Sequence, residues 1–331
     1  AARLAQRAYD VVKTERLKRG FTLDPEVDPA GSAFIGTMLS PVTSSQGNLS
    51  AKQTSVNPNF GAVLVQMLKT VGVQPGDLVA VGMSGSFPAL NVATLAALDA
   101  LDLRPLIVVS AAASQYGAND PNFVWLDMQR LLWERDVFPW RPLAASLGGI
   151  DDHAVGMSAE GRRLLDEAIA RSGVPRLDCT SLDDSVQKRM AVYLEAAGGA
   201  PIKAYINVGG GTTSVGTHIG KQVFKPGLNM TTPPDAPMVN SVMQRFSSEG
   251  VPVLHLVSIE RVAHDYGLPV APTQTPALGD GKVFMSPAYN PWLAAGGLGL
   301  ILATMVAFVR MDIGFLLRRA PRGAGVGSPL P

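Results

Sequence analysis

The stretch LVAVGMSGSFPALNVATLAALDALDLRPLIVV, residues 78–109, decides the fold. It contains two short apolar runs, at residues 78–82 and 106–109, on either side of an Ala- and Leu-rich segment at residues 87–101. Short runs that are apolar without a break are typical of parallel strands buried on both faces, and a longer apolar segment between them is typical of a crossover helix. The stretch therefore predicts a strand–helix–strand unit.

The same alternation extends along the chain around this unit. Further strands are expected at residues 143–147, 205–208 and 253–256, and helices at residues 2–19, 57–71, 121–135, 158–172, 182–197, 237–249 and 259–266. Alternating strands and helices predict an α/β domain with a mostly parallel sheet and flanking helices, in a Rossmann-like layered arrangement. In such a sheet, ligands bind beyond the carboxyl ends of the strands.

Composition narrows the classes of partner. The 331 residues are 47% hydrophobic and 17% charged, and their formal net charge is +1. A chain with so little net charge lacks the basic character typical of nucleic-acid-binding proteins, so no nucleic-acid partner is expected. Cys179 is the single cysteine, so no internal disulfide can form.

A second apolar stretch, WLAAGGLGLILATMVAFV at residues 292–309, carries no charged side chain. In a helix it rises about 27 Å, which is close to the roughly 30 Å hydrocarbon core of a bilayer. It therefore predicts a transmembrane helix that contacts the lipid bilayer, with a buried core helix as the alternative. Small residues recur at every fourth position of this stretch, a spacing that lets a second membrane helix pack closely against it. These are Ala295, Gly299, Ala303 and Ala307.

Basic residues indicate the orientation of this anchor, but the two ends of the chain disagree. The tail is basic, with one acidic residue, Asp312, and four basic ones: Arg310, Arg318, Arg319 and Arg322. The positive-inside rule then places the tail in the cytoplasm and the main domain on the other side of the membrane. The first twenty residues hold six further basic residues, which would favour the opposite orientation if another membrane helix preceded them. We expect the main domain to be extracytoplasmic.

These patterns divide the chain into five segments. They are an amphipathic N-terminal helix at 1–20, the α/β domain at 21–270, a Pro/Gly-rich linker at 271–291, the membrane anchor at 292–317 and a basic, flexible tail at 318–331.

Small and hydroxyl-bearing residues follow three of the predicted strands, at residues 82–86, 110–114 and 209–214. Because parallel strands end at one edge of the sheet, we expect these loops to share a pocket, together with Lys52 from the polar stretch 40–59. Glycines permit close backbone approach, and hydroxyls donate hydrogen bonds to carboxylates or phosphate. The alternative is that each loop is only a tight turn. The predicted ligand-binding residues are Ser84, Gly85, Ser86, Asn91, Ser110, Gly210, Gly211, Thr212, Thr213 and Lys52.

Ser84 and Ser86 are also candidate nucleophiles, because the strand–MSGS–helix pattern has the shape of a nucleophile elbow. The Gly-x-Ser-x-Gly signature of that elbow is absent. A serine needs a base, and His218 follows the third glycine-rich loop, with Asp151 or Asp152 as a third member. His255 lies within an apolar strand and is expected in the core.

Metal and cofactor sites are not expected. Asp151, Asp152 and His153 are adjacent in sequence, but they do not fall at a recognised metal-ligand spacing. Asp183 and Asp184 are better explained as acids at the start of a helix.

Three phrases carry a resemblance to a known family. They are GDLVAVGMSGSFPALN at residues 76–91, TSSQGNLSAKQTSVNPN at 43–59 and AYINVGGGTTSVG at 204–216 with its continuation HIG. With the C-terminal membrane helix, they resemble the bacterial poly-γ-glutamate system protein family over nearly the whole chain. Members accompany the membrane machinery that makes and exports poly-γ-glutamate, an anionic polymer of capsules and secretions. The resemblance supplies no catalytic residue.

The resemblance implies a membrane-anchored accessory component of poly-γ-glutamate biosynthesis or export, which binds the polymer, a glutamate-like ligand or the membrane subunits of the synthase. One alternative is a serine-type hydrolase or amidohydrolase acting on γ-glutamyl chains. Another is a structural assembly subunit whose small-residue helix face joins the complex. Whether the chain also forms a homo-oligomer is left open.

Overall fold

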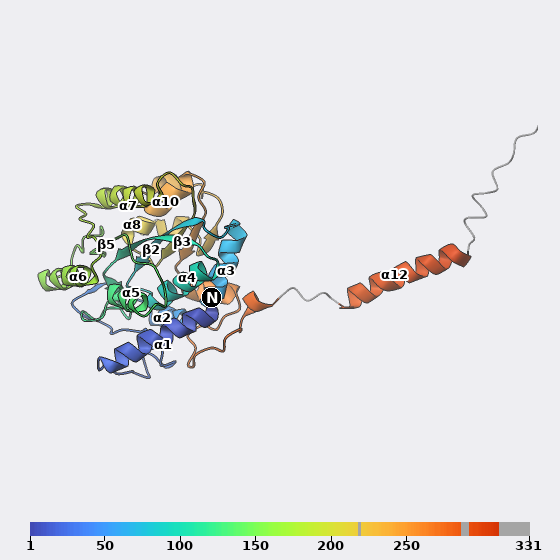
Figure 1. Ribbon diagram of the computed structural model, residues 1–331, viewed down its shortest axis with the longest axis horizontal. Coiled ribbons are helices and arrows are strands. Elements are labelled where there is room, and N and C mark those ends of the chain that lie inside the picture. Colours follow the sequence, from blue (N-terminus) through green and yellow to red (C-terminus); the bar gives the residue numbers. More distant parts are fainter. Residues whose placement is uncertain (218–219, 286–290, 311–331) are drawn as a thin grey trace, which may run out of the picture. The chain divides into compact units, whose positions relative to one another are not determined.

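The computed structural model describes residues 1–217, 220–285 and 291–310. It divides into two compact units, Ala1–Phe284 and Met285–Pro331. The first unit contains a six-stranded sheet with helices on both faces (Figure 1). The described part of the second unit contains one helix, which we describe by itself.

The sheet is mostly parallel, as the sequence predicts. Its strands are β2 (Leu78–Ser84), β3 (Arg104–Ser110), β5 (Ala144–Ser146), β6 (Ile202–Val208), β7 (Gly227–Asn229) and β8 (Val253–Leu256). Their spatial order is β5-β3-β2-β6-β8-β7, and every neighbouring pair is parallel except β7 with β8. The chain proceeds from β2 outward through β3 to β5, then returns to β6 on the other side of β2. The topological switch point, where α/β sheets bind ligands, therefore lies between β2 and β6.

Two hydrophobic cores cover the two faces of the sheet because successive side chains of a strand point to opposite faces. On β2, Val79, Val81 and Met83 face the larger core, whereas Leu78 and Ala80 face the smaller one. The larger core lies under α1 (Ala2–Lys18), α3 (Phe60–Val71), α4 (Pro88–Ala100), α5 (Trp125–Glu134), α6 (Ala159–Ser172) and α11 (Ile259–Asp265). The smaller core lies under α7 (Leu182–Ala197) and α10 (Val242–Ser248), on the opposite side of the sheet (Figure 1).

Side-chain caps explain where several helices begin. The Ser158 hydroxyl accepts a hydrogen bond from the Gly161 amide, and the Ser181 hydroxyl accepts one from the Asp184 amide. The predicted helices at 158–172 and 182–197 are confirmed as α6 and α7. Asp184 is a helix-start acid, as expected, and its carboxylate accepts a hydrogen bond from the Thr180 amide.

The polar stretch 40–59 contains more regular structure than the sequence predicts. It holds β1 (Thr43–Ser45), which pairs in parallel with the short strand β4 (Ala113–Ser114), and the helix α2 (Leu49–Ser55). Asn48 caps α2 by accepting a hydrogen bond from the Ala51 amide. Smaller differences occur at 237–249, where a 3₁₀ turn at Ala236–Met238 precedes the shorter α10.

Both ends of the first unit pack onto the sheet layers. The Tyr9 hydroxyl of α1 donates to the Ala89 carbonyl of α4 at 3.0 Å. Residues 271–284, which the sequence assigns to the linker, reach back to the domain: Asn59 donates to the Ala277 carbonyl at 2.8 Å, and the 3₁₀ turn Lys282–Phe284 contacts α3.

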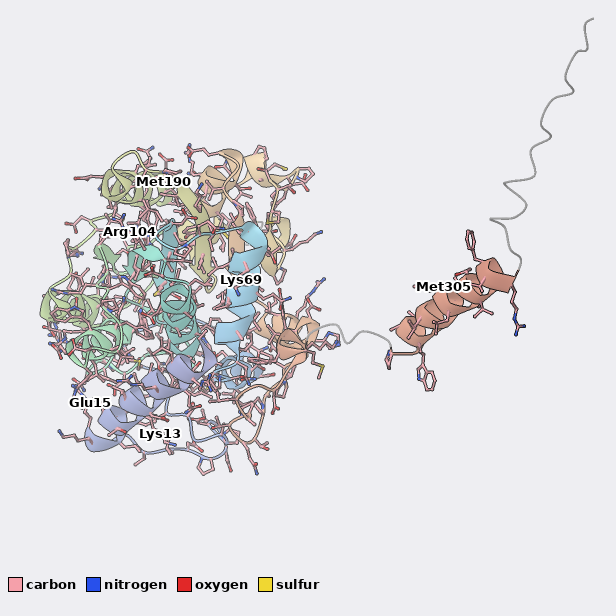
Figure 2. All side chains as sticks on the ribbon, turned by 45° about the vertical axis from the view of Figure 1, so that its right-hand side comes forward. Lys13, Glu15, Lys69, Arg104, Met190 and Met305 are labelled. Atoms are coloured by element: carbon pink, nitrogen blue, oxygen red, sulfur yellow. The ribbon has the colours of Figure 1, made fainter. Side chains whose placement is uncertain are left out.

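The second unit contains α12 (Pro291–Arg310). Among the described residues, it is the one helix long and apolar enough to cross a bilayer, with a mean hydropathy of 2.1. None of its residues is buried, and its apolar side chains, such as Met305, are drawn in Figure 2. The predicted anchor residues 311–317 and the tail 318–331 lie outside the described residues.

Candidate functional site

A cavity of about 540 Å³ opens at the carboxyl ends of β2 and β3, beside the switch point. It brings together the three strand-end loops and the polar stretch 40–59, which confirms the expected convergence. Seven of the predicted ligand-binding residues line it, namely Lys52, Ser84, Ser86, Ser110, Gly210, Gly211 and Thr212. The binding role of these residues stays a prediction.

The other three predicted residues, Gly85, Asn91 and Thr213, lie behind the cavity wall. The Gly85 amide donates to the Ala112 carbonyl. Asn91 is fully buried and donates to the Ser84 carbonyl at 2.8 Å. The Thr213 hydroxyl lies 3.1 Å from the Ser185 hydroxyl. Their hydrogen bonds hold the strand ends and loops that carry the lining residues.

The pairing of β1 with β4 forms one side of the cavity. Ser45 lies opposite Ser114 in this pair, and the Gln115 amide donates to the Ser45 carbonyl at 3.0 Å. Gly47 lies two residues after Ser45, and a Cβ atom at this position would lie 2.2 Å from the Gln115 carbonyl oxygen. Only glycine allows this close approach, which carries the chain into α2.

Lys52 projects from α2 into the wall of this cavity and is 2% exposed. Its Nζ donates to the Ser114 hydroxyl at 2.8 Å and to the Ser86 carbonyl, and it lies 3.9 Å from the centroid of the Phe87 ring. Among the described residues, these contacts include no carboxylate. Burial lowers the pKa of the Lys52 ammonium to about 7, because removal from water disfavours the charged form. Near neutral pH, Lys52 is therefore present in both its charged and its neutral form.

Ser84 and Ser86, the nucleophiles that the sequence suggests, are held by backbone contacts. The Ser84 hydroxyl donates to the Val208 carbonyl at 3.3 Å, which ties the end of β2 to β6. The Ser86 hydroxyl accepts a hydrogen bond from the Ser114 amide at 3.1 Å. Their predicted base, His218, lies outside the described residues.

A buried ion pair lies behind the cavity wall and contacts it through Ser110. Asp152 is 2% exposed and Arg189 is 1% exposed, and their closest atoms are 2.8 Å apart. Asp152 also accepts hydrogen bonds from the hydroxyls of Ser110, Ser146 and Ser185. Burial by itself lowers the pKa of the Arg189 guanidinium, but Asp152, together with Tyr193 and Tyr205, more than offsets this, so the pKa stays above its ordinary value.

This ion pair gives Asp152 a different role from the one that the sequence suggests. Its carboxylate accepts hydrogen bonds from Arg189 and from three hydroxyls. Sequence reasoning missed Arg189. The available signal was its place on the buried face of the helix, next to Met190 and one turn before Tyr193.

The described histidines lie away from the cavity lining. His255 is fully buried, as expected, and its Nδ1 accepts a hydrogen bond from Asn207 at 3.0 Å. His153 lies 3.2 Å from the Asp151 carbonyl, and His264 is exposed. Within the described ranges, no group of three or more His, Cys, Asp or Glu side chains is arranged to hold a metal ion.

Comparisons with protein-family models, with curated proteins and with solved structures give no match. The resemblance to the poly-γ-glutamate system family therefore rests on the sequence phrases alone. The chemistry of the cavity must supply any further argument about function.

That chemistry is polar. Hydroxyl and amide groups from Ser44, Asn48 and Thr212 line the cavity, and its volume is typical of a small-molecule site. Lys52 and Glu260 are the ionisable side chains among the described lining residues. The arrangement suits a polar ligand that presents a carboxylate to Lys52 and amide groups to the hydroxyls.

Proposed function

We propose that this protein is a membrane-anchored accessory component of bacterial poly-γ-glutamate biosynthesis or export, and that its cavity binds a segment of the polymer or a glutamate-like ligand. The observation that carries the proposal is the buried Lys52 in a polar cavity at the strand ends. A buried ammonium that has no carboxylate among its described contacts gains stability from a carboxylate on a ligand.

The polymer has matching chemistry. A γ-linked glutamyl chain carries a free carboxylate on every residue and an amide between residues. The protonated Lys52 would pair with one carboxylate, and the hydroxyls of Ser44 and Thr212 would bond to the amides. Glu260 at the same cavity would repel further carboxylates. The cavity would therefore accept one carboxylate, at Lys52, and would not bind anions without selection.

The proposal places α12 across the bacterial cytoplasmic membrane, with the first unit on the outer side, built as a Rossmann-like layered domain. Its support is the length and hydropathy of α12 and the basic tail. The small-residue face that includes Gly299 would pack against a membrane subunit of the synthase. If Gly299→Leu leaves co-purification with those subunits intact, this contact is refuted.

Ligand binding is tested by calorimetry on the full chain in detergent, with L-glutamate and a γ-glutamyl trimer as ligands. Lys52→Met removes the charge at nearly constant shape. Because a charge-assisted hydrogen bond contributes about 1.5–3 kcal/mol, we expect Kd to rise at least about tenfold. Lys69→Met is the matched control, because Lys69 lies exposed on α3, outside the cavity lining (Figure 2).

The same measurement is repeated at several pH values. Affinity for the carboxylate should fall as the pH rises from 6 to 8.5, because free Lys52 loses its proton near pH 7. Wild-type protein that binds neither ligand at millimolar concentration would exclude the proposed ligand class. Equal affinities for wild type and Lys52→Met would exclude Lys52 as the carboxylate-binding group.

A further inference from the structure

Ser114 and Lys52 form a pair that the sequence does not single out. The Ser114 hydroxyl lies 2.8 Å from Lys52 Nζ, and both residues line the cavity. Ser84 and Ser86 lie nearby, but no nitrogen base of the described residues is hydrogen-bonded to their hydroxyls. A serine beside a buried lysine is the arrangement that Ser–Lys acyl-transfer sites use.

We propose that this pair makes the cavity catalytic, with Ser114 as the nucleophile and Lys52 as the general base in the cleavage of an amide-linked acyl group. The inference rests on the proposed function for its substrate, a γ-glutamyl chain, but it uses the neutral form of Lys52, whereas carboxylate binding uses the protonated form. A chain whose carboxylate pairs with protonated Lys52 is therefore bound without being cleaved, and cleavage requires the amide carbonyl to lie at Ser114 beside the neutral amine. It differs from the hydrolase that the sequence suggests, because the nucleophile is another serine and the base is a lysine.

The contacts of Lys52 suit a neutral amine. In the protonated form, Nζ donates to both the Ser86 carbonyl and the Ser114 hydroxyl. A neutral amine has two N–H groups and one lone pair, so after deprotonation one N–H can still donate to the Ser86 carbonyl while the contact with Ser114 reverses and the lone pair accepts the hydroxyl proton. Burial, which lowers the pKa of Lys52 to about 7, leaves a large share of the residue neutral at ordinary pH. The Phe87 ring excludes water from one side of Nζ.

The backbone fixes Ser114 in position. It belongs to β4, where it lies opposite Ser45, and its amide donates to the Ser86 hydroxyl at 3.1 Å. Ser114 is 8% exposed, and the cavity gives access to its side chain. A nucleophile held by a strand pair and a backbone hydrogen bond needs little reorganisation before attack.

The reaction is balanced with water as the co-reactant. Ser114 Oγ forms a bond to the amide carbonyl carbon while its proton passes to Lys52 Nζ. The carbon–nitrogen bond then breaks, and Lys52 returns the proton to the leaving amine. Water attacks the resulting Ser114 ester, Lys52 accepts the water proton and passes it to Ser114 Oγ, and a free carboxylic acid leaves.

The first test labels the full chain in detergent with a fluorophosphonate probe and maps the modified peptide by mass spectrometry. We expect wild-type protein to be labelled on Ser114, and Ser114→Ala to lose the label. Ser248→Ala is the matched control, because Ser248 lies exposed at the end of α10, away from the cavity. A label on another serine, or no label on wild type, would overturn the inference without any variant needing to fold.

The second test follows γ-glutamyl oligomer length by liquid chromatography and mass spectrometry. We expect Ser114→Ala to reduce cleavage at least about 100-fold while it still binds the oligomer. The wild-type rate should rise from pH 6 to 8 as Lys52 becomes neutral, with Glu260 as the other ionisable group at the cavity.

The outcomes separate the two proposals. Wild-type protein that binds the oligomer but cleaves none of it refutes the Ser114–Lys52 reaction and leaves the binding function intact. Cleavage that Ser114→Ala does not reduce also refutes it. Labelling of Ser114 in a protein that binds no γ-glutamyl ligand supports the reactive pair and refutes the proposed substrate.

Discussion

The replacement Asp152→Asn probes the buried ion pair behind the cavity. Asn has nearly the shape of Asp and tolerates the left-handed backbone at this position, where φ is 63°. The change therefore removes the negative charge and little else. It leaves Arg189, which is 1% exposed, without a carboxylate among its described partners.

The expected loss of stability is large. Breaking a buried ion pair by removing one partner costs about 3–5 kcal/mol, because the remaining charge is buried without compensation. The unfolding entropy of the 284 residues of the first unit is about 0.6 kcal/mol per degree near the midpoint. The melting temperature should therefore fall by about 5–8 °C.

Calorimetric or circular-dichroism melting of the full chain in detergent measures this change. Glu167→Gln is the control, because it breaks the ion pair with Arg163 on the surface of α6, where both side chains are more than half exposed. That change should cost less than about 1 kcal/mol. The double variant Asp152→Asn with Arg189→Met should be more stable than Asp152→Asn alone, since it buries no unpaired charge.

Two results would refute this reasoning. One is a melting temperature for Asp152→Asn within about 1 °C of wild type, a shift below 1 kcal/mol. The other is a double variant less stable than Asp152→Asn alone. Either would mean that Arg189 reaches water or another partner when Asp152 loses its charge.

Three further predictions concern the cavity and the anchor. Lys52 has a lowered pKa of about 7 when folded and its ordinary pKa when unfolded, so the unfolded state binds more protons above pH 7. In urea unfolding between pH 7 and 9.5, the stability of wild type should therefore rise relative to that of Lys52→Met by up to about 1.4 kcal/mol per pH unit. Plots of stability against pH that run parallel for the two proteins would contradict this. Gly47→Ala should destabilise the fold and weaken γ-glutamyl binding, because its Cβ would meet the Gln115 carbonyl at 2.2 Å, whereas Gly211→Ala, with no atom within 4 Å of its Cβ, should leave the melting temperature unchanged. Ile301→Arg near the middle of α12 should make the free energy of membrane insertion about 2.5–3.5 kcal/mol less favourable, so carbonate extraction should release more of the variant than of wild type from membranes. If the membranes retain both proteins equally, α12 is not a spanning helix.

Much of the fold could be predicted because its signals are local. The apolar run at 78–82 defines β2, and the caps Ser158 and Ser181 define the starts of α6 and α7. Within an element, neighbours in space are neighbours in sequence, so periodicity is sufficient. The helix α2 was missed because its seven residues carry no apolar stripe, although the Asn48 cap was visible.

The site could be predicted only in outline. A parallel sheet brings strand ends to one edge, so the meeting of the three Gly/Ser/Thr loops followed from the fold class. Asn91 and Thr213 do not line the cavity, although both follow strand ends in the sequence. Asn91 lies in the first turn of α4 and Thr213 in the helical turn Thr212–Val215, and a first turn is too short for periodicity to show which way a side chain faces. His218 lies outside the described residues, so the base that the sequence suggests stays a prediction.

Local sequence patterns were sufficient for the α/β class, the starts of α6 and α7 and the apolar segment that becomes α12. Only the tertiary structure decided that Lys52 meets Ser114, 62 residues away, and that Asp152 meets Arg189, 37 residues away. The first contact depends on the pairing of β1 with β4, and the second on α7 covering the sheet beside β3 and β5. Local sequence patterns show which residues of one helix or strand are buried. The Lys52–Ser114 and Asp152–Arg189 contacts depend instead on the order of the strands in the sheet and on how the loops bring distant segments together. The chemistry proposed for the cavity therefore depends on neighbours that only folding brings together.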